Sequence, residues 1–480
     1  MLFNRLKVSG FLSFGAEGID LELRPLNVLI GANGSGKSNL IEAFGVIKGA
    51  ARSDLTEGLN REELAKEWLH KGKVEARLEA WVNPLSPGPV LQHELVLREQ
   101  NGRLELGGER VLDGGEGPVY DFREGNPLLR IGRGIRADRV RRDQSILTLL
   151  VDPENYPEFS RLEESYRWMQ MHRNFDFGPS SRMRDAQSRD IRSDHLMDGG
   201  LNLAAVLSQF PGEARREVVR CLQQVYEGIV DFRVSTGGSD IRLFVEEKGG
   251  LEVPIRRLSD GTLRYLYLLA ILLHPDPPPF VVIEEPELGL HPDLIHVITK
   301  LIREASKRMQ IVITTHSRQL IDALSEEPEA VVVCEEEDGE SRFERLDGER
   351  MKVWLERYSL GELWGKGELG GNRWLAPRFT LRAAARGVHF MRRSVVLGLI
   401  FSRRPVLQID LESYGEGAEA LLGVIFWRLK GTKLTLTWYF CLSIARKYRR
   451  RGKRFGRTWP KEKPIDGRGR TPLVTMRHTS

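Results

Sequence analysis

An apolar run leads directly into a glycine-rich loop in the stretch Leu26-Asn27-Val28-Leu29-Ile30-Gly31-Ala32-Asn33-Gly34-Ser35-Gly36-Lys37-Ser38. The loop matches G-x-x-x-x-G-K-[ST], the phosphate-binding pattern found between a buried strand and a helix. Its glycines let backbone N–H groups turn inward around phosphate oxygens, and the start of the helix adds a positive dipole end. We therefore expect a strand at 26–30, a helix from about Lys37 to Ile47, Lys37 at the β- and γ-phosphates, and Ser38 at Mg²⁺.

The flanking sequence predicts an α/β fold. Strands are expected at 5–8, 18–23, 229–235, 241–246 and 251–255, and an antiparallel meander over 74–112. Residues 113–143, rich in Gly and Arg, are expected as a surface excursion, and 158–228 as mainly helical. The remainder alternates: helix 260–274, strand 280–284, helix 292–307, strand 310–315, helix 317–325 and strand 330–335. Such alternation is typical of a parallel sheet covered by helices.

A second apolar strand, Phe280-Val281-Val282-Ile283, ends in Glu284-Glu285-Pro286-Glu287. Charges at the carboxyl end of a buried parallel strand point into the crevice where α/β sheets bind ligands. Because adjacent strand residues face opposite ways, Glu284 and Glu285 can take separate roles. One would hold Mg²⁺ through water and the other would polarise an attacking water. The alternative is a solvated acidic turn.

Two further segments flank this strand. Leu258-Ser259-Asp260-Gly261-Thr262-Leu263-Arg264 opens an apolar helix, and Ser259 by itself could be only a helix N-cap. Its position 25 residues before Glu284 favours a functional role. Thr314-Thr315-His316-Ser317 ends a later strand, which would place His316 as a sensor of the γ-phosphate.

The composition is that of a soluble globular protein: 480 residues, 41% hydrophobic and 29% charged. This excludes a wholly disordered, collagen-like or multi-span membrane protein. No apolar signal segment follows Met1, and the three cysteines, Cys221, Cys334 and Cys441, are too few and too far apart for a disulfide framework or a zinc pattern. We therefore expect a cytoplasmic protein in a reducing compartment.

The net charge of +5 is unevenly distributed. Residues 376–480 contain 23 Lys and Arg against 6 Asp and Glu, whereas residues 1–375 contain 49 against 61. The basic character therefore belongs to a tail, and the first 375 residues cannot be assigned to nucleic-acid binding on charge alone.

Taken together, the four segments resemble the ABC-type P-loop ATPases, and more narrowly the RecF/SMC/OLD-like group. The phosphate loop resembles their Walker A motif, Leu258–Arg264 their signature in an LSDGT form, Phe280–Pro292 their Walker B motif, and Thr315-His316-Ser317 their switch histidine. The resemblance covers residues 1–375. It implies an ABC-type ATPase head, a mixed sheet flanked by helices, with an inserted α/β-helical arm lobe.

The resemblance also implies site residues and cofactors. The cofactors would be ATP and Mg²⁺, with Glu285 as the catalytic carboxylate and His316 as the phosphate sensor. Mg²⁺ would be held by Ser38, Glu284 and the lid-loop glutamine, for which Gln144 is the candidate. ATP would be held by Gly31, Asn33, Gly34, Ser35, Gly36, Lys37, Ser38 and Asn39, and by Ser259 and Gly261 acting on the nucleotide of the other protomer.

The expected organisation follows from these motifs. Residues 1–50 form the first part of the head, 51–250 antiparallel strands and the inserted lobe, 251–375 the second part of the head, and 376–480 a basic tail. We expect an ATP-hydrolysing ATPase that dimerises through an ATP sandwich and acts on DNA in repair, recombination or defence, with an accessory protein and no integral membrane partner. The alternatives are a transporter ATPase subunit and an ATP-gated scaffold without significant hydrolysis.

Two segments leave further alternatives. Three interpretations of residues 376–480 are open: a genuine basic appendage, a membrane anchor, or an extension without selected structure. The apolar run Leu434–Ala445 in this tail is too short to span a bilayer. Residues 331–338 superficially resemble the first strand of an OLD-type nuclease domain. Asp338-Gly339 instead predicts a hairpin turn, and no Asp-x-Asp metal-ligand pattern follows.

Overall fold

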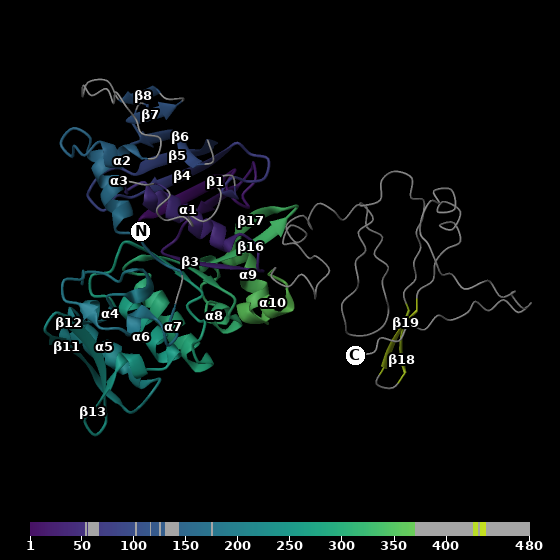
Figure 1. The fold of residues 1–480 in the computed structure, drawn as a ribbon. Helices are drawn as coiled ribbons and strands as arrows, with labels where there is room; N and C mark the ends of the chain where they lie inside the picture. The colour runs from purple at the N-terminus through teal and green to yellow at the C-terminus, as the bar shows by residue number, and fades with distance from the viewer. Residues whose placement is uncertain are drawn as a thin grey trace, which may run out of the picture. The chain divides into compact units, whose positions relative to one another are not determined.

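The computed structural model describes residues 1–52, 55, 67–100, 103–115, 117–123, 126–129, 144–173, 176–369, 426–430 and 433–437. The chain divides into two compact units, Met1–Met391 and Arg392–Ser480. The first unit contains three sheets and the helices that cover them (Figure 1).

The central sheet carries the predicted motifs. Its strands are β3 (Leu26–Gly31), β9 (Gln170–His172), β14 (Phe280–Glu284), β15 (Gln310–Thr315), β16 (Val331–Glu337) and β17 (Glu340–Arg345). They are ordered β17-β16-β3-β15-β14-β9, and all neighbours are parallel except the β16–β17 hairpin. The hairpin turns at Asp338 and Gly339, both with positive φ, as their sequence predicts. The carboxyl ends of β3, β14, β15 and β9 therefore meet at one edge.

A seven-stranded antiparallel sheet lies beside the central one. It contains β1 (Phe3–Ser9), β2 (Ile19–Glu22), β4 (Glu75–Val82), β5 (Leu91–Gln100), β6 (Arg103–Leu112), β7 (Tyr120–Arg123) and β8 (Asn126–Leu129). The meander predicted over 74–112 is confirmed as β4, β5 and β6. The surface excursion predicted for 113–143 is wrong for 120–123 and 126–129, because β7 and β8 extend this sheet; residues 116, 124–125 and 130–143 lie outside the described residues.

The third sheet and the helices complete the unit. The sheet holds β10 (Gln187–Ser188), β11 (Ile229–Gly237), β12 (Asp240–Glu247) and β13 (Leu251–Pro254). The helices are α1 (Lys37–Gly49), α2 (Ile146–Leu149), α3 (Pro157–Arg167), α4 (Leu203–Ser208), α5 (Gly212–Gln223), α6 (Asp260–Leu272), α7 (Pro292–Ala305), α8 (Arg318–Asp322), α9 (Gly348–Leu355) and α10 (Leu360–Lys366). Residues 158–228 were predicted to be mainly helical, but helices fill only part of this range, since the short strands β9 and β10 also lie within it.

The two faces of the central sheet pack against two separate cores. Val28 and Ile30 of β3 face a core built with α4 to α8 and the third sheet, whereas Leu29 between them faces a core built with α1, α3 and the seven-stranded sheet. A strand buried on both faces reads as a continuous apolar run, which is the pattern of 28–30 and 280–283. The predicted α/β class, with mixed sheets flanked by helices, is therefore confirmed.

The second unit contributes one described hairpin, β18 (Phe426–Lys430) paired antiparallel with β19 (Lys433–Thr437). The rest of the predicted tail, 376–480, lies outside the described residues. Among the helices that are described, none combines the length and the apolar character that crossing a bilayer requires.

Candidate nucleotide-binding site

The glycine-rich loop joins β3 to α1 as the motif predicts. Gly34 and Gly36 have φ of 80° and 92°, a conformation that a residue with a Cβ adopts only at a cost, and Gly36 is the N-cap of α1. The Lys37 side chain is buried across the loop, where its Nζ donates to the carbonyl oxygens of Gly31 at 2.9 Å and Ala32 at 3.0 Å. Burial lowers the pKa of this ammonium group. The loop is thus held closed by the cation that the motif assigns to phosphate.

Residues far away in sequence support the back of the loop. A Cβ on Gly36 would lie 2.1 Å from Ser341 Oγ and 2.8 Å from Ser13 Oγ, so only glycine fits there. Ser13 Oγ also lies 2.6 Å from Asn39 Nδ2 and 2.6 Å from Ser341 Oγ. The β17 strand and the turn after β1 therefore brace the start of α1.

Glu284 and Glu285 face one cavity together. Glu284 ends β14, and Glu285 leaves the strand with a left-handed φ of 44°. Its N–H donates to Thr314, to the carbonyl oxygen at 3.0 Å and to Oγ1 at 3.2 Å. This turn interrupts the strand alternation, and so both carboxylates line the cavity rather than opposite faces of the sheet.

His316 lies next to these carboxylates, with its Nε2 3.8 Å from Glu285 Oε1. Burial, with the positive charge of Lys37, lowers the pKa of His316, so the imidazole is neutral at pH 7.

A residue that sequence reasoning missed holds the loop that carries His316: Glu287 Oε1 accepts hydrogen bonds from Thr315 Oγ1 at 2.6 Å, His316 N at 3.0 Å and Ser317 N at 3.2 Å. The Glu-Glu-Pro-Glu spacing was the signal that could have identified it.

Arg173 is a second residue that the sequence did not reveal. It follows β9, which pairs with β14 so that His172 is opposite Ile283. Arg173 Nε lies 3.5 Å from Glu284 Oε2, and the guanidinium also pairs with Glu42 of α1. A three-residue strand in an apparently helical stretch gives no periodic signal, so only its pairing with β14 brings Arg173 to the site.

The predicted signature segment lies at the start of α6. Ser259 is exposed and caps the helix by accepting from Thr262 N at 3.1 Å. Neither Ser259 nor Gly261 is among the described residues that line the cavity of their own chain. Arg264, one turn further, does line it, and its Nη2 donates to the Glu285 carbonyl oxygen at 2.6 Å. Burial lowers the pKa of Arg264 to about 10, which leaves it charged at pH 7.

Gln144, the candidate lid-loop glutamine, is not brought to the cavity. Its neighbour Ser145 hydrogen-bonds to Glu109 of the seven-stranded sheet and caps α2. Gly31 and Ser35 are buried residues of the loop and are likewise not among the described residues that line the cavity. Arg173, rather than Gln144, is the described residue that pairs with Glu284.

The cavity has a volume of about 500 Å³, within the range of small-ligand sites. Its lining residues are Asn33, Gly34, Gly36, Lys37, Ser38, Asn39, Arg173, Arg264, Glu284, Glu285, Leu288, Thr314 and His316. Cations and loop N–H groups suit phosphate oxygens. The hydroxyl of Ser38 and the carboxylate of Glu284 are hard oxygen donors of the kind that Mg²⁺ prefers, so the residues fit a magnesium nucleotide.

Comparison with known sequences agrees with this chemistry. Residues 26–322 match the family described as "AAA domain, putative AbiEii toxin, Type IV TA system". The OLD nuclease of Thermus scotoductus is 22% identical over 347 residues, which cover 66% of this chain and 59% of that protein. The chain thus spans less than two thirds of the length of this curated relative. The resemblance to P-loop ATPases of the RecF/SMC/OLD type is confirmed.

Solved structures with detectable similarity include two SMC heads. The Smc head domain with an extended coiled coil, bound to the C-terminal domain of ScpA and derived from Pyrococcus furiosus, is 13% identical, covers 74% of this chain and 99% of that one, and has a TM-score of 0.48. The SMC head domain from Thermotoga maritima is 15% identical, covers 72% of this chain and all of that one, and has a TM-score of 0.37.

Proposed function

Since this chain belongs to that family of AAA domains, we propose that it binds ATP with Mg²⁺ in the cavity at the carboxyl ends of β3, β14 and β15, and hydrolyses it to ADP and phosphate. One observation carries the proposal. Side chains from four separate segments, Lys37 and Ser38, Glu284 and Glu285, Arg173, and His316, line the same cavity. Phosphoryl transfer needs positioning and charge neutralisation, which these groups supply.

Each residue has a distinct task. Lys37 would exchange its two loop carbonyls for the β- and γ-phosphates, keeping its buried position. Ser38 and Glu284 would hold Mg²⁺, which supplies charge neutralisation between the phosphates. Glu285, 3.8 Å from neutral His316, would accept a hydrogen bond from the attacking water, and the His316 ring would donate to the γ-phosphate.

Dimerisation through the nucleotide is the second part of the proposal. Ser259 and Gly261 lie at the N-terminal end of α6 outside their own cavity, and a helix N-terminus favours an anion. We propose that ATP closes a homodimer in which these residues contact the nucleotide of the partner, and that hydrolysis opens it.

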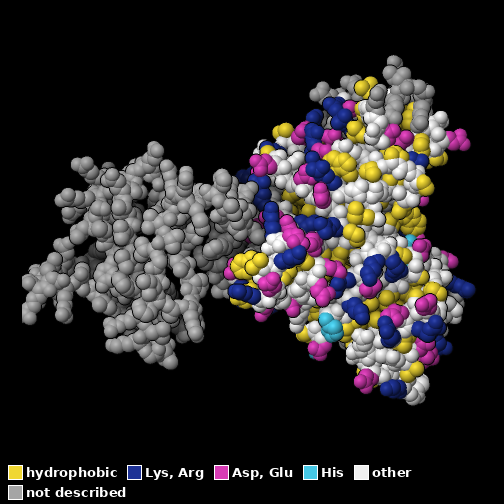
Figure 2. Space-filling view, turned by 180° about the vertical axis from the view of Figure 1, so that it is seen from behind, with side chains coloured by type: hydrophobic (Ala, Val, Ile, Leu, Met, Phe, Trp, Pro, Cys, Tyr) yellow, Lys and Arg dark blue, Asp and Glu magenta, His cyan; other side chains and the backbone are white. Residues whose placement is uncertain are grey.

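The proposed context is DNA metabolism or defence. The similarity to an OLD nuclease supports this context, and any direct contact with DNA requires a basic surface. On the face of the first unit shown in Figure 2, Lys and Arg are interspersed with Asp and Glu rather than gathered in one patch. Residues 1–375 carry fewer Lys and Arg than Asp and Glu, 49 against 61, so we propose that nonspecific binding to DNA depends on the basic residues of 376–480.

Mixing two inactive variants tests the proposed reaction. Lys37→Ala removes the phosphate cation, and Ser259→Arg blocks the shared surface, so each alone should hydrolyse almost no ATP. An equimolar mixture should recover about a quarter of wild-type turnover, because half of the dimers are mixed and each holds one intact site. A mixture no more active than its parents contradicts the shared site.

Absence of turnover by wild-type protein, with ATP bound, would favour the ATP-gated scaffold. Adding DNA ends to the wild-type assay tests the context, since DNA that leaves turnover unchanged contradicts it.

A further inference from the structure

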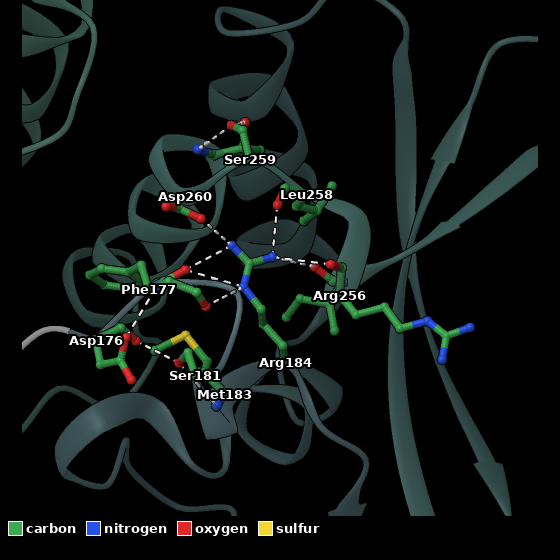
Figure 3. A network of polar contacts seen from close by, with 12 residues as sticks. Asp176, Phe177, Ser181, Met183, Arg184, Arg256, Leu258, Ser259 and Asp260 are labelled. Carbon is green, nitrogen blue, oxygen red and sulfur yellow. Dashed lines mark hydrogen bonds and ion pairs between the residues drawn. The ribbon is translucent and has the colours of Figure 1, made fainter.

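Arg184 is a buried arginine whose guanidinium hydrogen-bonds to backbone carbonyls of two separate segments, 177–178 and 255–258. It lies in the 3₁₀ turn Arg182–Arg184, and its side chain is only 5% exposed. Figure 3 shows it at the centre of a polar network below the start of α6. It donates to the carbonyl oxygens of Phe177, Gly178, Ile255, Arg256 and Leu258, and to the carboxylate of Asp260.

The shortest of these contacts lie on either side of Ser259. Arg184 Nη1 donates to the Leu258 carbonyl oxygen at 2.7 Å, and Nη2 to Asp260 Oδ1 at 2.6 Å. Asp260 is 63% exposed and Ser259 is exposed, so little packing holds this segment from the solvent side. Arg184 therefore sets where the loop begins and where the first turn of α6 starts.

The same arginine is linked to the catalytic carboxylate through Phe177. The Phe177 carbonyl oxygen accepts from Arg184 at 2.8 Å, and the Phe177 ring lies 5.4 Å from the Arg264 guanidinium. Arg264 in turn donates to the carbonyl oxygen of Glu285 at 2.6 Å. The start of α6 and the residue proposed to position water thus share one continuous set of contacts.

We propose that Arg184 is a positioning residue for the shared site: it fixes the Leu258–Gly261 segment in the geometry in which Ser259 and Gly261 meet the partner protomer's nucleotide. The inference rests on the proposed function. A planar guanidinium with five donors can hold several carbonyls at once, whereas a lysine has three donors on a flexible stem. A substitution of Arg184 should therefore affect hydrolysis of the ATP bound by the partner protomer, and should not affect ATP binding by the phosphate loop of its own chain.

The test is complementation by Arg184→Lys. Alone, this variant should bind ATP as wild type does but hydrolyse it about 10- to 100-fold more slowly, since small displacements of a positioned group have effects of this size. Mixed with Lys37→Ala it should recover about a quarter of wild-type turnover, because one site then combines an intact phosphate loop with an intact α6 segment. Mixed with Ser259→Arg it should recover nothing, since every site then has a defective α6 segment.

A control separates this role from the general loss of an arginine that binds backbone carbonyls. Arg345 donates to the carbonyl oxygens of Glu329 and Glu22 and to Asn27 Oδ1, away from the cavity. Arg345→Lys should reduce thermal stability comparably while its turnover at a temperature where it is folded stays within about twofold of wild type. If Arg184→Lys does not fold, Asp260→Asn provides the second variant. This variant removes a charge from an exposed side chain and should lower ATP turnover several-fold. Mixing it with Lys37→Ala should restore turnover, and mixing it with Ser259→Arg should not.

The outcomes are separable. Wild-type protein without ATP turnover or ATP-dependent dimers refutes the proposed function itself. With wild type active, the inference on Arg184 is overturned if Arg184→Lys keeps turnover within twofold, if it loses ATP binding in parallel with turnover, or if Ser259→Arg rescues it as well as Lys37→Ala does. The same three results with Asp260→Asn overturn it where Arg184→Lys cannot be measured.

Discussion

Truncation of Glu287 should release the loop that carries His316. One carboxylate oxygen accepts from the buried Thr315 hydroxyl and from the N–H groups of His316 and Ser317. A hydrogen bond to a charged group contributes about 1.5–3 kcal/mol, but these three share one oxygen and the exposed His316 N–H can bond to water instead. We therefore expect Glu287→Ala to lower the free energy of unfolding by about 2–4 kcal/mol, and Glu287→Gln, which keeps an acceptor oxygen, by about 1–2 kcal/mol.

Urea unfolding followed by linear extrapolation measures the stability change, and steady-state ATP turnover measures the effect on the site. His316 lies 3.8 Å from Glu285, so a looser loop should lower kcat about tenfold or more with little change in KM. Thr315→Val is the control because it deletes one of the three hydrogen bonds to Glu287, together with the one that Thr315 Oγ1 accepts from Ser317 N at 3.0 Å, at a cost of about 1–2 kcal/mol. Glu287→Ala within about 0.5 kcal/mol of wild type, with unchanged kcat, would refute the reasoning.

Three further predictions concern the site and its surroundings. Lys37→Ala should abolish ATP binding by calorimetry while circular dichroism stays native, because it removes the buried cation of the phosphate loop; unchanged affinity would refute the site. Glu285→Gln should bind ATP, hydrolyse it very slowly and accumulate a dimer in sedimentation; a monomer at saturating ATP, or full turnover, contradicts the mechanism. Burial, with the charge of Lys48, lowers the pKa of His172 from 6.5 to about 3. The unfolded chain then takes up the proton first, so the free energy of unfolding should fall by up to about 1.4 kcal/mol per pH unit as pH drops from 6.5 towards 3. His172→Gln should lose this slope in denaturant titrations at several pH values, and a slope unchanged from wild type would show that another group is responsible.

The elements with a strong local signal were predictable. The β3 strand and its loop, the apolar strand β14, and the Asp338-Gly339 turn each follow from adjacent residues: apolar runs for buried strands, glycines where φ is positive. The parallel direction of these strands, which brings the loop, both carboxylates and His316 to one edge, followed from the α/β alternation, whereas their order came only from the structure. Local chemistry thus determined the phosphate loop, the acid pair and the class of fold.

The tertiary structure alone decided which other side chains complete the site. Arg173 reaches Glu284 only because the short strand β9 pairs with β14, more than a hundred residues later, whereas Gln144 lies by the seven-stranded sheet. Arg184 binds carbonyl groups more than seventy residues away. Every residue type carries a backbone carbonyl, so the sequence does not indicate which carbonyl an arginine will bind. A strand of three residues is too short to show a hydrophobic period. Contacts of both kinds depend on how distant segments pack, which no local pattern in the sequence records.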